Sequence, residues 1–215
     1  MIRNLSQHNS ILQQFLAEIR DVEIQKDSMR FRKNLERIGE IFAYEISKSF
    51  VFEEVQTSTP LGIAETRQLV SQPVIATILR AGLPMHLGLL NYFDRAQSSF
   101  ISAYRKHHKN NTFEVMLDYV ATPEIEDKVL ILCDPMLASG ASLELTYKAL
   151  LAKGTPSHTH IVTAIASTEG LAYLKSKIIG NYTIWCGAID EELTAQAYIV
   201  PGLGDAGDLA FGEKI

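Results

Sequence analysis

Apolar residues recur at helical spacing through the first fifty positions of the chain. A first set, whose members are three or four residues apart except for one adjacent pair, consists of Leu12, Phe15, Leu16 and Ile19. A second, longer set with similar spacing consists of Phe31, Leu35, Ile38, Phe42 and Ile46. Because this period places side chains on one side of an α-helix, the pattern predicts a helical N-terminal segment over about residues 1–50.

From Pro73 onward the pattern changes to short apolar runs that are rich in β-forming residues. The runs are PVIATIL at 73–79, SSFISAYRK at 98–106, VLILC at 129–133, HIVTAIA at 160–166 and YTIWCGAI at 182–189. Helical segments lie between several of them, which is typical of parallel sheets covered by helices. We therefore predict an α/β fold in one domain over 1–215: a doubly wound, mostly parallel sheet flanked by helices. Asn110-Asn111 suits the turn of a hairpin arm that could fold over a site.

Composition narrows the class of protein. The chain has 215 residues, 47% of them hydrophobic, which is enough for one substantial core. Its net charge of -5 gives no electrostatic footprint for nucleic acid. No apolar stretch approaches the roughly 20 residues of a membrane helix, and the N-terminus lacks the apolar core of a signal peptide, so we expect a cytoplasmic protein. Cys133 and Cys186 are expected to be buried free thiols, and Trp185 a core residue.

Residues 128–153 predict a strand, a tight loop and the start of a helix. The β-forming run ends at Cys133, small residues occupy 138–142, and an apolar helix face follows at Leu143, Tyr147, Leu150 and Leu151. The first turn of a helix leaves backbone N–H groups unpaired, so a small-residue loop at that point can surround a phosphate. No lysine follows Gly140 and no GxGxxG is present, which argues against a nucleoside-triphosphate P-loop and a dinucleotide fingerprint.

Charged residues follow three of the predicted strands. Asp134 stands directly before the loop, where a carboxylate can accept hydrogen bonds from the vicinal hydroxyls of a ribose 5-phosphate. The alternative is that Asp134 only caps the turn. Arg80 precedes Ala81-Gly82, a setting that suits a guanidinium presented to pyrophosphate, with a surface salt bridge as its alternative. Arg105 ends the next predicted strand and has the same two interpretations, a guanidinium presented to pyrophosphate or a surface salt bridge.

The segment 198–208, YIVPGLGDAGD, predicts a shaped loop rather than a regular element. Gly and Pro interrupt both helix and strand, and three glycines fall within these eleven residues. Glycine permits backbone conformations and close ligand approach that a Cβ would block, so main-chain groups here can read the edge of a planar base. A polar connecting turn is the alternative.

Together these segments resemble the uracil phosphoribosyltransferases, a family of type I phosphoribosyltransferases. The run 134–142 is similar to the family's loop for phosphoribosyl pyrophosphate (PRPP), and 198–208 is similar to its uracil-binding segment. The supporting matches are Ile78-Leu79-Arg80-Ala81-Gly82-Leu83, Tyr104-Arg105, Tyr44-Glu45 and Thr59-Pro60-Leu61-Gly62. The resemblance covers the chain from about Arg20 to its end.

Two loop residues depart from the family's usual Ala-Thr-Gly-Gly-Ser. Ser139 stands for the Thr and keeps the hydroxyl, whereas Ala141 stands for the second Gly. If position 141 needs a positive φ, we expect the methyl group to cost about 1 kcal/mol and to weaken phosphate binding.

The resemblance implies an enzyme of pyrimidine salvage that joins uracil to PRPP, giving UMP and pyrophosphate, with a small C-terminal hood over the base. The implied catalytic residues are Asp134, Arg80 and Arg105. The implied PRPP site consists of Arg80, Arg105, Asp134, Pro135, Met136, Leu137, Ala138, Ser139, Gly140, Ala141, Ser142 and Asp205. The implied uracil site consists of Ile199, Gly204, Asp205 and Ala206. Mg²⁺ is the implied cofactor, held through PRPP rather than by side chains, and a homodimer or higher homo-oligomer is the implied assembly.

Other interpretations stay open. A non-catalytic regulator that senses a pyrimidine nucleotide and binds RNA would need a basic face, and the dense basic cluster is Arg105-Lys106-His107-His108-Lys109. A purine or orotate enzyme typically carries two adjacent acids before the loop, which Pro135 argues against. His158 and His160 could place both imidazoles on one strand face, but without a third ligand nearby they indicate a metal only weakly.

Overall fold

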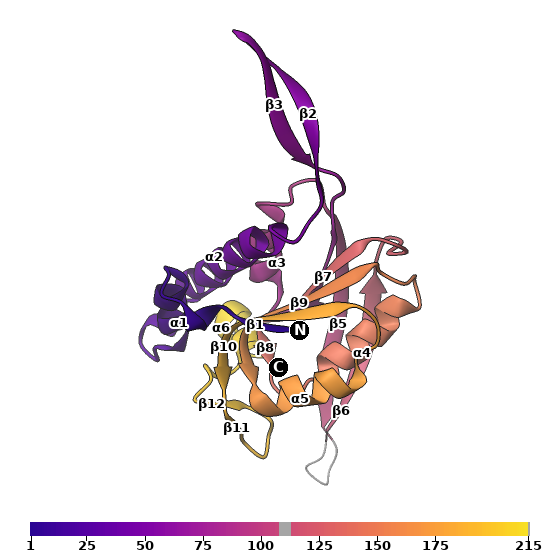
Figure 1. The fold of residues 1–215 in the computed structure, drawn as a ribbon. Helices are drawn as coiled ribbons and strands as arrows, with labels where there is room; N and C mark the ends of the chain where they lie inside the picture. The colour runs from indigo at the N-terminus through magenta and orange to yellow at the C-terminus, as the bar shows by residue number, and fades with distance from the viewer. Residues whose placement is uncertain (108–112, 215) are drawn as a thin grey trace.

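The computed structural model of the chain describes residues 1–107 and 113–214, with backbone alone for 104–107 and 113–116. Its centre is a sheet with the strand order β1-β10-β9-β7-β4-β5-β6, to which β8 adds by pairing with β9 (Figure 1). The strands are β1 (Ile2–Asn4), β4 (Val74–Leu79), β5 (Gln97–His107), β6 (Phe113–Ala121), β7 (Val129–Cys133), β8 (Met136–Leu137), β9 (His158–Ser167) and β10 (Tyr182–Asp190). Every pairing is parallel except that of β5 with β6, so the predicted mostly parallel sheet is confirmed.

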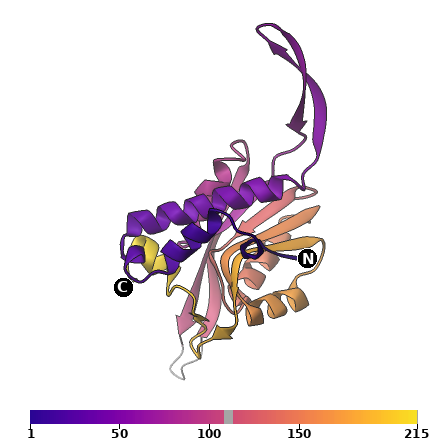
Figure 2. The same ribbon diagram turned by 60° about the vertical axis from the view of Figure 1, so that its left-hand side comes forward.

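Helices cover both faces of the sheet, which explains why strands such as β4 and β9 are buried along almost their whole length. One face carries α1 (Leu12–Arg20), α2 (Ser28–Ser47), α3 (Leu83–Leu90) and α6 (Ala206–Phe211). The other face carries α4 (Ala141–Leu151) and α5 (Thr168–Lys177) (Figures 1 and 2). Each group of helices closes its own apolar cluster against the sheet, and the predicted doubly wound architecture is confirmed.

The two predicted apolar faces near the N-terminus belong to α1 and α2. All members of the α2 face are buried, as are Leu12, Leu16 and Ile19 on α1. Asp27 fixes the start of α2 because its Oδ1 accepts hydrogen bonds from the N–H groups of Met29 and Arg30. The helical expectation does not extend to the first residues, where β1 pairs with β10 at the edge of the sheet and is followed by the 3₁₀ turn η1 (Leu5–Gln7).

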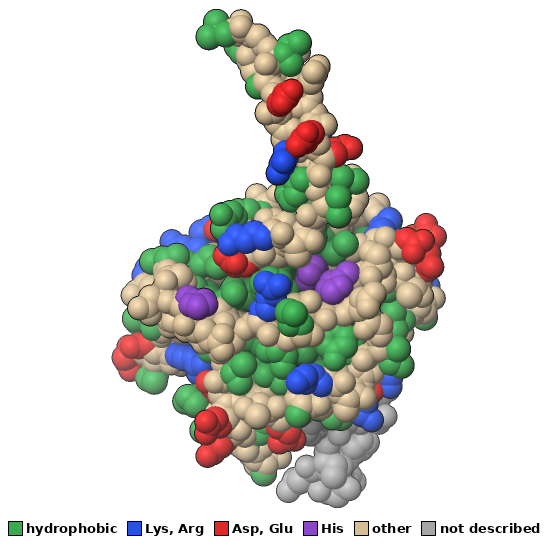
Figure 3. Space-filling view, viewed as in Figure 1, with side chains coloured by type: hydrophobic (Ala, Val, Ile, Leu, Met, Phe, Trp, Pro, Cys, Tyr) green, Lys and Arg blue, Asp and Glu red, His purple; other side chains and the backbone are tan. Residues whose placement is uncertain are grey.

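A hairpin that the hydrophobic pattern did not predict stands clear of the body of the molecule. It consists of β2 (Phe52–Thr59) and β3 (Gly62–Leu69), joined at Pro60-Leu61 (Figures 1 and 3). Neither strand has a buried residue, so no apolar alternation marks it in the sequence. The available signal was local: β-branched residues on both sides of Thr59-Pro60-Leu61-Gly62, a turn-forming tetrapeptide.

The predicted hairpin between β5 and β6 is present as an antiparallel pair, and its proposed turn at Asn110-Asn111 lies outside the described residues. A separate two-stranded sheet forms from β11 (Glu192–Leu193) and β12 (Ile199–Val200). Together with the loop that follows and α6, it makes up the small C-terminal hood.

Several side chains singled out in the sequence are core residues. Trp185 is buried and donates its indole N–H to His160 Nδ1 at 3.0 Å. The rings of His158 and His160 lie 4.6 Å apart on one face of β9, and among the described residues there is no group of three metal-ligating side chains. Cys133 and Cys186 are buried free thiols, and burial raises the pKa of each to about 12.

No helix in the described part of the chain is long and apolar enough to cross a membrane.

His86 on α3 makes stability depend on pH. Its side chain is fully buried, with Nε2 3.0 Å from Ser98 Oγ, and burial lowers the pKa of His86 to about 4. Above about pH 6.5 the ring is neutral in the folded and unfolded states. Below that value only the unfolded chain takes up the proton, until the pH reaches the folded pKa. We therefore expect the free energy of unfolding to fall as the pH drops from about 6.5 to about 4.

The measurement is urea unfolding at pH 7.0 and pH 4.5 for the wild type and His86→Met. Carboxylates contribute to the pH dependence of both proteins, so the difference between them isolates His86. We expect the loss of stability between the two pH values to be smaller in the variant by about 2 kcal/mol. An equal loss in both proteins would contradict the assignment.

Candidate active site

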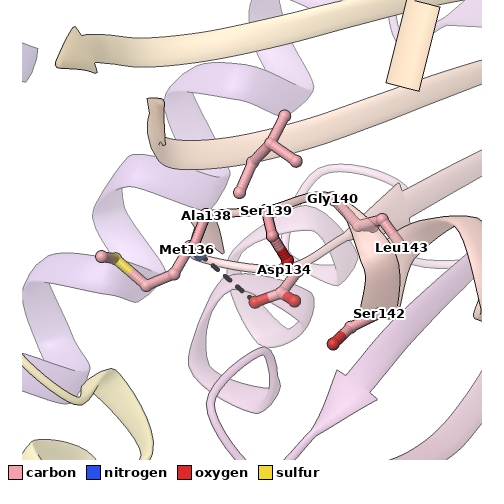
Figure 4. Close-up of a pocket in the computed structure, with 8 residues that line it drawn as sticks. Asp134, Met136, Ala138, Ser139, Gly140, Ser142 and Leu143 are labelled. Carbon is pink, nitrogen blue, oxygen red and sulfur yellow. Dashed lines mark hydrogen bonds between the residues drawn. The ribbon is translucent and has the colours of Figure 1, made fainter. Parts of the chain in front are cut away.

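The loop between β7 and α4 is folded around a concave surface. Its lining residues are Asp134, Met136, Leu137, Ala138, Ser139, Gly140, Ser142 and Leu143 (Figure 4). Gly140 immediately precedes α4 with φ +82°, a left-handed conformation that favours glycine. A Cβ on Gly140 would also approach Tyr173 Cδ1 to 3.0 Å. The glycine therefore lets the chain turn sharply from the strand into the helix while α5 packs behind it.

The loop presents backbone donors that the protein does not use. Among the described residues, the N–H groups of 139–143 donate to no protein acceptor, whereas Glu144 N–H closes the first helical bond to Gly140. These N–H groups surround the positive end of the α4 dipole. A phosphate is the group that best matches several converging N–H donors at such a position.

Ala141 does not need a positive φ. It is the first residue of α4 and is absent from the described non-glycine residues with positive φ, while Gly140 takes the left-handed conformation. The Ala141 methyl group therefore causes none of the backbone strain that a positive φ at this position would have caused. Alanine also favours helix more than glycine does, by about 1 kcal/mol, so this departure stabilises the first turn.

Asp134 has a structural bond and faces the same hollow. Its Oδ1 accepts a hydrogen bond from the Met136 N–H at 3.2 Å, so the contact expected from turn capping is present. Asp134, Ser139 and Ser142 line the same hollow (Figure 4). A carboxylate has about four lone-pair positions, so capping the turn and accepting hydrogen bonds from the hydroxyls of a ligand are compatible roles.

Two hydroxyls on β9 hold this loop in place, and the sequence analysis did not identify either. Thr163 Oγ1 accepts the Leu137 N–H at 3.1 Å. Ser167 Oγ donates to the Ala138 carbonyl at 2.6 Å and accepts the Gly170 N–H at 2.8 Å, which also caps α5. The available signal was the presence of Thr163 and Ser167 in an almost wholly buried strand.

Removing the Ser167 hydroxyl should loosen the loop without touching the ligand. We expect Ser167→Ala to raise the KM for PRPP about five-fold, because a lost hydrogen bond to the loop is worth about 1 kcal/mol. Ser167→Thr keeps the hydroxyl and should restore most of the affinity. The check is steady-state kinetics with PRPP varied, alongside the melting temperature of each variant. A melting temperature that falls in Ser167→Ala with no change in KM would assign Ser167 to capping alone.

Arg80 connects this region to the C-terminal segment. Its Nη2 donates to Asp208 Oδ1 at 3.0 Å and to the Gly212 carbonyl at 3.1 Å. The ion pair predicted as the alternative role is thus present, but the side chains are 39% and 31% exposed. Exposed pairs contribute little to stability, so an anionic ligand can compete for the guanidinium.

The turn after β4 joins the two predicted halves of the site. Cys133 Sγ lies 4.0 Å from the Gly82 carbonyl, and a Cβ on Gly207 would lie 4.0 Å from Ala81 Cβ. The residues that follow Arg80 therefore lie between the loop after β7 and the C-terminal segment. Arg105 lies near the end of β5, opposite Val115, but its side chain is outside the described part of the structure.

The predicted loop at 198–208 is irregular only in its middle, because Ile199–Val200 form β12 and α6 begins at Ala206. Ile199 is buried and pairs with Leu193, and Gly202 and Gly204 have φ values of +56° and +96°. Asp205 caps α6 because its Oδ1 accepts the Gly207 N–H at 2.8 Å and the Asp208 N–H at 3.0 Å. Within the described chain, the N–H groups of Gly204 and Ala206 donate no hydrogen bond. Two main-chain donors are thus available beside the cap.

Comparisons with known proteins establish the family of this chain. A family model for uracil phosphoribosyltransferase matches residues 5–213. A uracil phosphoribosyltransferase of Porphyromonas gingivalis is 52% identical, over 99% of this chain and 98% of its own length. The chain belongs to the uracil phosphoribosyltransferase family. A family member from Methanothermobacter thermautotrophicus is 39% identical, over 95% of this chain and 93% of its own.

A solved structure shares the whole fold. A protein from Aquifex aeolicus superimposes with a TM-score of 0.87 at 30% identity, covering 99% of this chain and 98% of that one. The family predicted from the motifs at 134–142 and 198–208 is confirmed, although the roles of individual residues in those motifs stay predictions.

Proposed function

We propose that this member of the uracil phosphoribosyltransferase family transfers the 5-phosphoribosyl group of PRPP to uracil, giving UMP and pyrophosphate. The observation that supports this most directly is the placement of two sets of unused backbone donors. One set surrounds the start of α4 and the other lies at Gly204 and Ala206, with the Arg80 turn between them. A sugar phosphate and a flat heterocycle can therefore be held at neighbouring positions, which is the requirement for joining them.

The donor is proposed to bind across the loop after β7. The N–H groups of 139–142 and the hydroxyls of Ser139 and Ser142 take the 5′-phosphate, while Asp134 accepts hydrogen bonds from the ribose hydroxyls. Arg80 and Arg105 take the pyrophosphate, with Arg80 exchanging its bond to Asp208 for the ligand. Asp205 orients the donor through the carboxylate oxygen that does not cap α6.

Uracil is proposed to lie against Ile199 and the residues 204–206. The Gly204 and Ala206 N–H groups suit its carbonyl oxygens, and a main-chain carbonyl suits its N3–H. A pocket that reads the base through main chain holds its donors and acceptors rigidly. This rigidity provides selectivity for one pattern of hydrogen-bonding groups.

Mg²⁺ is proposed to enter with the donor. Among the described residues no cluster of carboxylates, cysteines or histidines can hold a metal by itself, which fits an ion bound through pyrophosphate and ribose oxygens. When bound, the ion neutralises charge that develops on the departing pyrophosphate.

The proposed chemistry needs positioning more than a nucleophile. The C1′ centre passes through an oxocarbenium-like state, so the residues named above act by aligning the two reactants and stabilising the leaving group. Cys133, directly before the loop, is buried and its pKa is raised to about 12, which fits a structural thiol. No side-chain nucleophile is required in this scheme.

The proposed partners are the small molecules uracil and PRPP, with no nucleic acid and no membrane, and the proposed compartment is the cytoplasm.

We also propose a homodimer or higher homo-oligomer. Support comes from the projecting β2–β3 hairpin and its neighbouring residues, where Val51, Phe52, Leu61 and Ile63 are exposed apolar side chains. The RNA-binding alternative depends on the cluster 105–109, whose side chains lie outside the described part of the structure.

The deciding experiment incubates the purified protein with PRPP, Mg²⁺ and each free base in turn, and measures nucleotide and pyrophosphate. UMP formed in equal amount with pyrophosphate, and only with uracil, is the expected result. No product with any base, combined with tight and salt-resistant RNA binding, would favour the regulator.

A further inference from the structure

An ion pair from two distant parts of the chain lies behind the proposed base-binding loop. Arg20 is the last residue of α1 and Asp190 is the last residue of β10. The guanidinium and the carboxylate meet in two parallel bonds, Nη1 to Oδ2 at 2.7 Å and Nη2 to Oδ1 at 2.8 Å. The Asp190 side chain is 8% exposed and that of Arg20 is 23% exposed, so the pair is largely shielded from water.

Both members of the pair also hold the backbone of one loop residue, Gly202. Arg20 Nη1 donates to the Gly202 carbonyl at 3.0 Å, and the Gly202 N–H donates to Asp190 Oδ2 at 2.9 Å. Both main-chain polar groups of Gly202 are therefore engaged by the same ion pair. This arrangement fixes the orientation of the peptide planes on either side of Gly202.

The held residue lies at a close approach of the loop to its own backbone. Gly202 has φ +56°, and a Cβ there would lie 2.1 Å from the Ile199 carbonyl oxygen. Two residues later Gly204 presents an unused N–H, followed by that of Ala206. Because the chain between these positions is short, a rotation of the peptide at Gly202 would change where both donors point.

The carboxylate stays charged under ordinary conditions. Burial by itself would raise the pKa of Asp190, but hydrogen bonds from Arg20 and from the Gly202 N–H outweigh it and lower the pKa below its usual value. Charge-assisted bonds of this bidentate kind are stronger and more directional than neutral ones. They suit a role in which geometry matters.

We propose that Arg20 and Asp190 are positioning residues for the base: they set the backbone of 199–204 so that the Gly204 and Ala206 N–H groups meet the uracil oxygens. Neither side chain is required to touch the substrate. The proposal rests on the proposed function, because it assigns the loop to uracil. It predicts that breaking the ion pair weakens the binding and selection of the base and leaves the binding of PRPP largely unchanged.

The chain offers a matched control in a second ion pair of similar construction. Glu18, 7% exposed, receives two bonds from Arg30, Nη2 to Oε1 at 2.8 Å and Nε to Oε2 at 2.9 Å. This pair joins α1 to α2 and has no hydrogen bond to a residue of 198–208. Breaking it should cost stability without changing the geometry of the base loop.

The test compares Arg20→Met, Arg20→Lys and Arg30→Met in steady-state kinetics with uracil and PRPP varied separately, together with melting temperatures. We expect Arg20→Met to raise the KM for uracil about ten-fold or more, while the KM for PRPP changes less than two-fold. Arg20→Lys, which keeps one charged bond, should recover part of the uracil affinity. Arg30→Met should lower the melting temperature and leave both KM values unchanged.

A uracil KM in Arg20→Met no higher than in Arg30→Met, or equal increases in both KM values, would overturn the proposal. If Arg20→Met does not fold, Asp190→Asn decides the question. It keeps an oxygen for the Gly202 N–H, loses the charge, and should raise the uracil KM by several-fold. Wild-type protein without transferase activity would overturn the proposed function instead, so the two failures are distinguishable.

Discussion

Asp134→Asn is expected to lower kcat/KM for PRPP by about 100-fold to 1000-fold while leaving the fold intact. The asparagine side-chain oxygen still accepts the Met136 N–H, so the turn after β7 keeps its bond. The variant loses the charge-assisted hydrogen bonds to the ribose hydroxyls, each worth about 1.5 to 3 kcal/mol, and leaves an amide facing the ligand. The measurement is initial rates with PRPP varied at saturating uracil, with thermal unfolding as the check on folding.

Asp134→Ala completes this test because it separates the two roles of the carboxylate. Alanine removes the turn bond together with the carboxylate, whereas asparagine removes the charge and keeps an oxygen for the turn bond. If Asp134 serves only to cap the turn, Asp134→Asn keeps wild-type kinetics and Asp134→Ala alone is impaired. That outcome would remove Asp134 from the site. Equal, large losses of kcat/KM in both variants would establish it as a ligand of the donor.

Uracil is expected to exceed cytosine in kcat/KM by at least ten-fold to a hundred-fold. Uracil presents an N3–H donor between two carbonyl acceptors, and the proposed site pairs these groups with the main chain of 199–206. Cytosine replaces one acceptor with an amino group, so a backbone N–H would face another donor. Leaving such a group without a partner costs about 1 to 3 kcal/mol. Hypoxanthine and guanine should be rejected by size, because main chain cannot swing aside as a side chain could.

This preference is measured as kcat/KM for each base at saturating PRPP and Mg²⁺. Small 5-substituted uracils keep the same hydrogen-bonding edge and provide the control for pocket size. They should react only as far as the pocket admits the substituent. Comparable specificity constants for uracil and any one of cytosine, hypoxanthine or guanine would refute the assignment of 198–208 as a uracil-reading loop.

The local parts of the fold and site could be predicted because the signals lie within short windows. The spacing from Phe31 to Ile46 defines one helix face, and that face is buried in α2. The apolar run ending at Cys133, followed by small residues, predicts strand, loop and helix because each part depends on neighbouring side chains and on glycine. The φ of +82° falls at Gly140, so the substitution at Ala141 has no backbone cost.

Where the sequence analysis failed, the deciding contacts are not local or leave no hydrophobic trace. The β2–β3 hairpin buries no side chain, so the period-2 pattern that marks a half-buried strand is missing. The Ser167 hydroxyl looks like an ordinary strand residue until α5 and the loop after β7 bring Gly170 and Ala138 to it.

The amino-acid sequence by itself determined the family, the alternation of strands and helices, and the two loops that offer backbone donors. These features follow from the spacing of apolar residues and from the backbone conformations that Gly and Pro allow. Both are set by residues that are close together in the sequence. Only the tertiary structure decided that Arg80 meets Asp208 and that Arg20 and Asp190 together hold Gly202. Such partners lie more than a hundred positions apart along the chain in all but one case. Only the sheet order and helix packing bring them within hydrogen-bonding distance, and no local pattern encodes that.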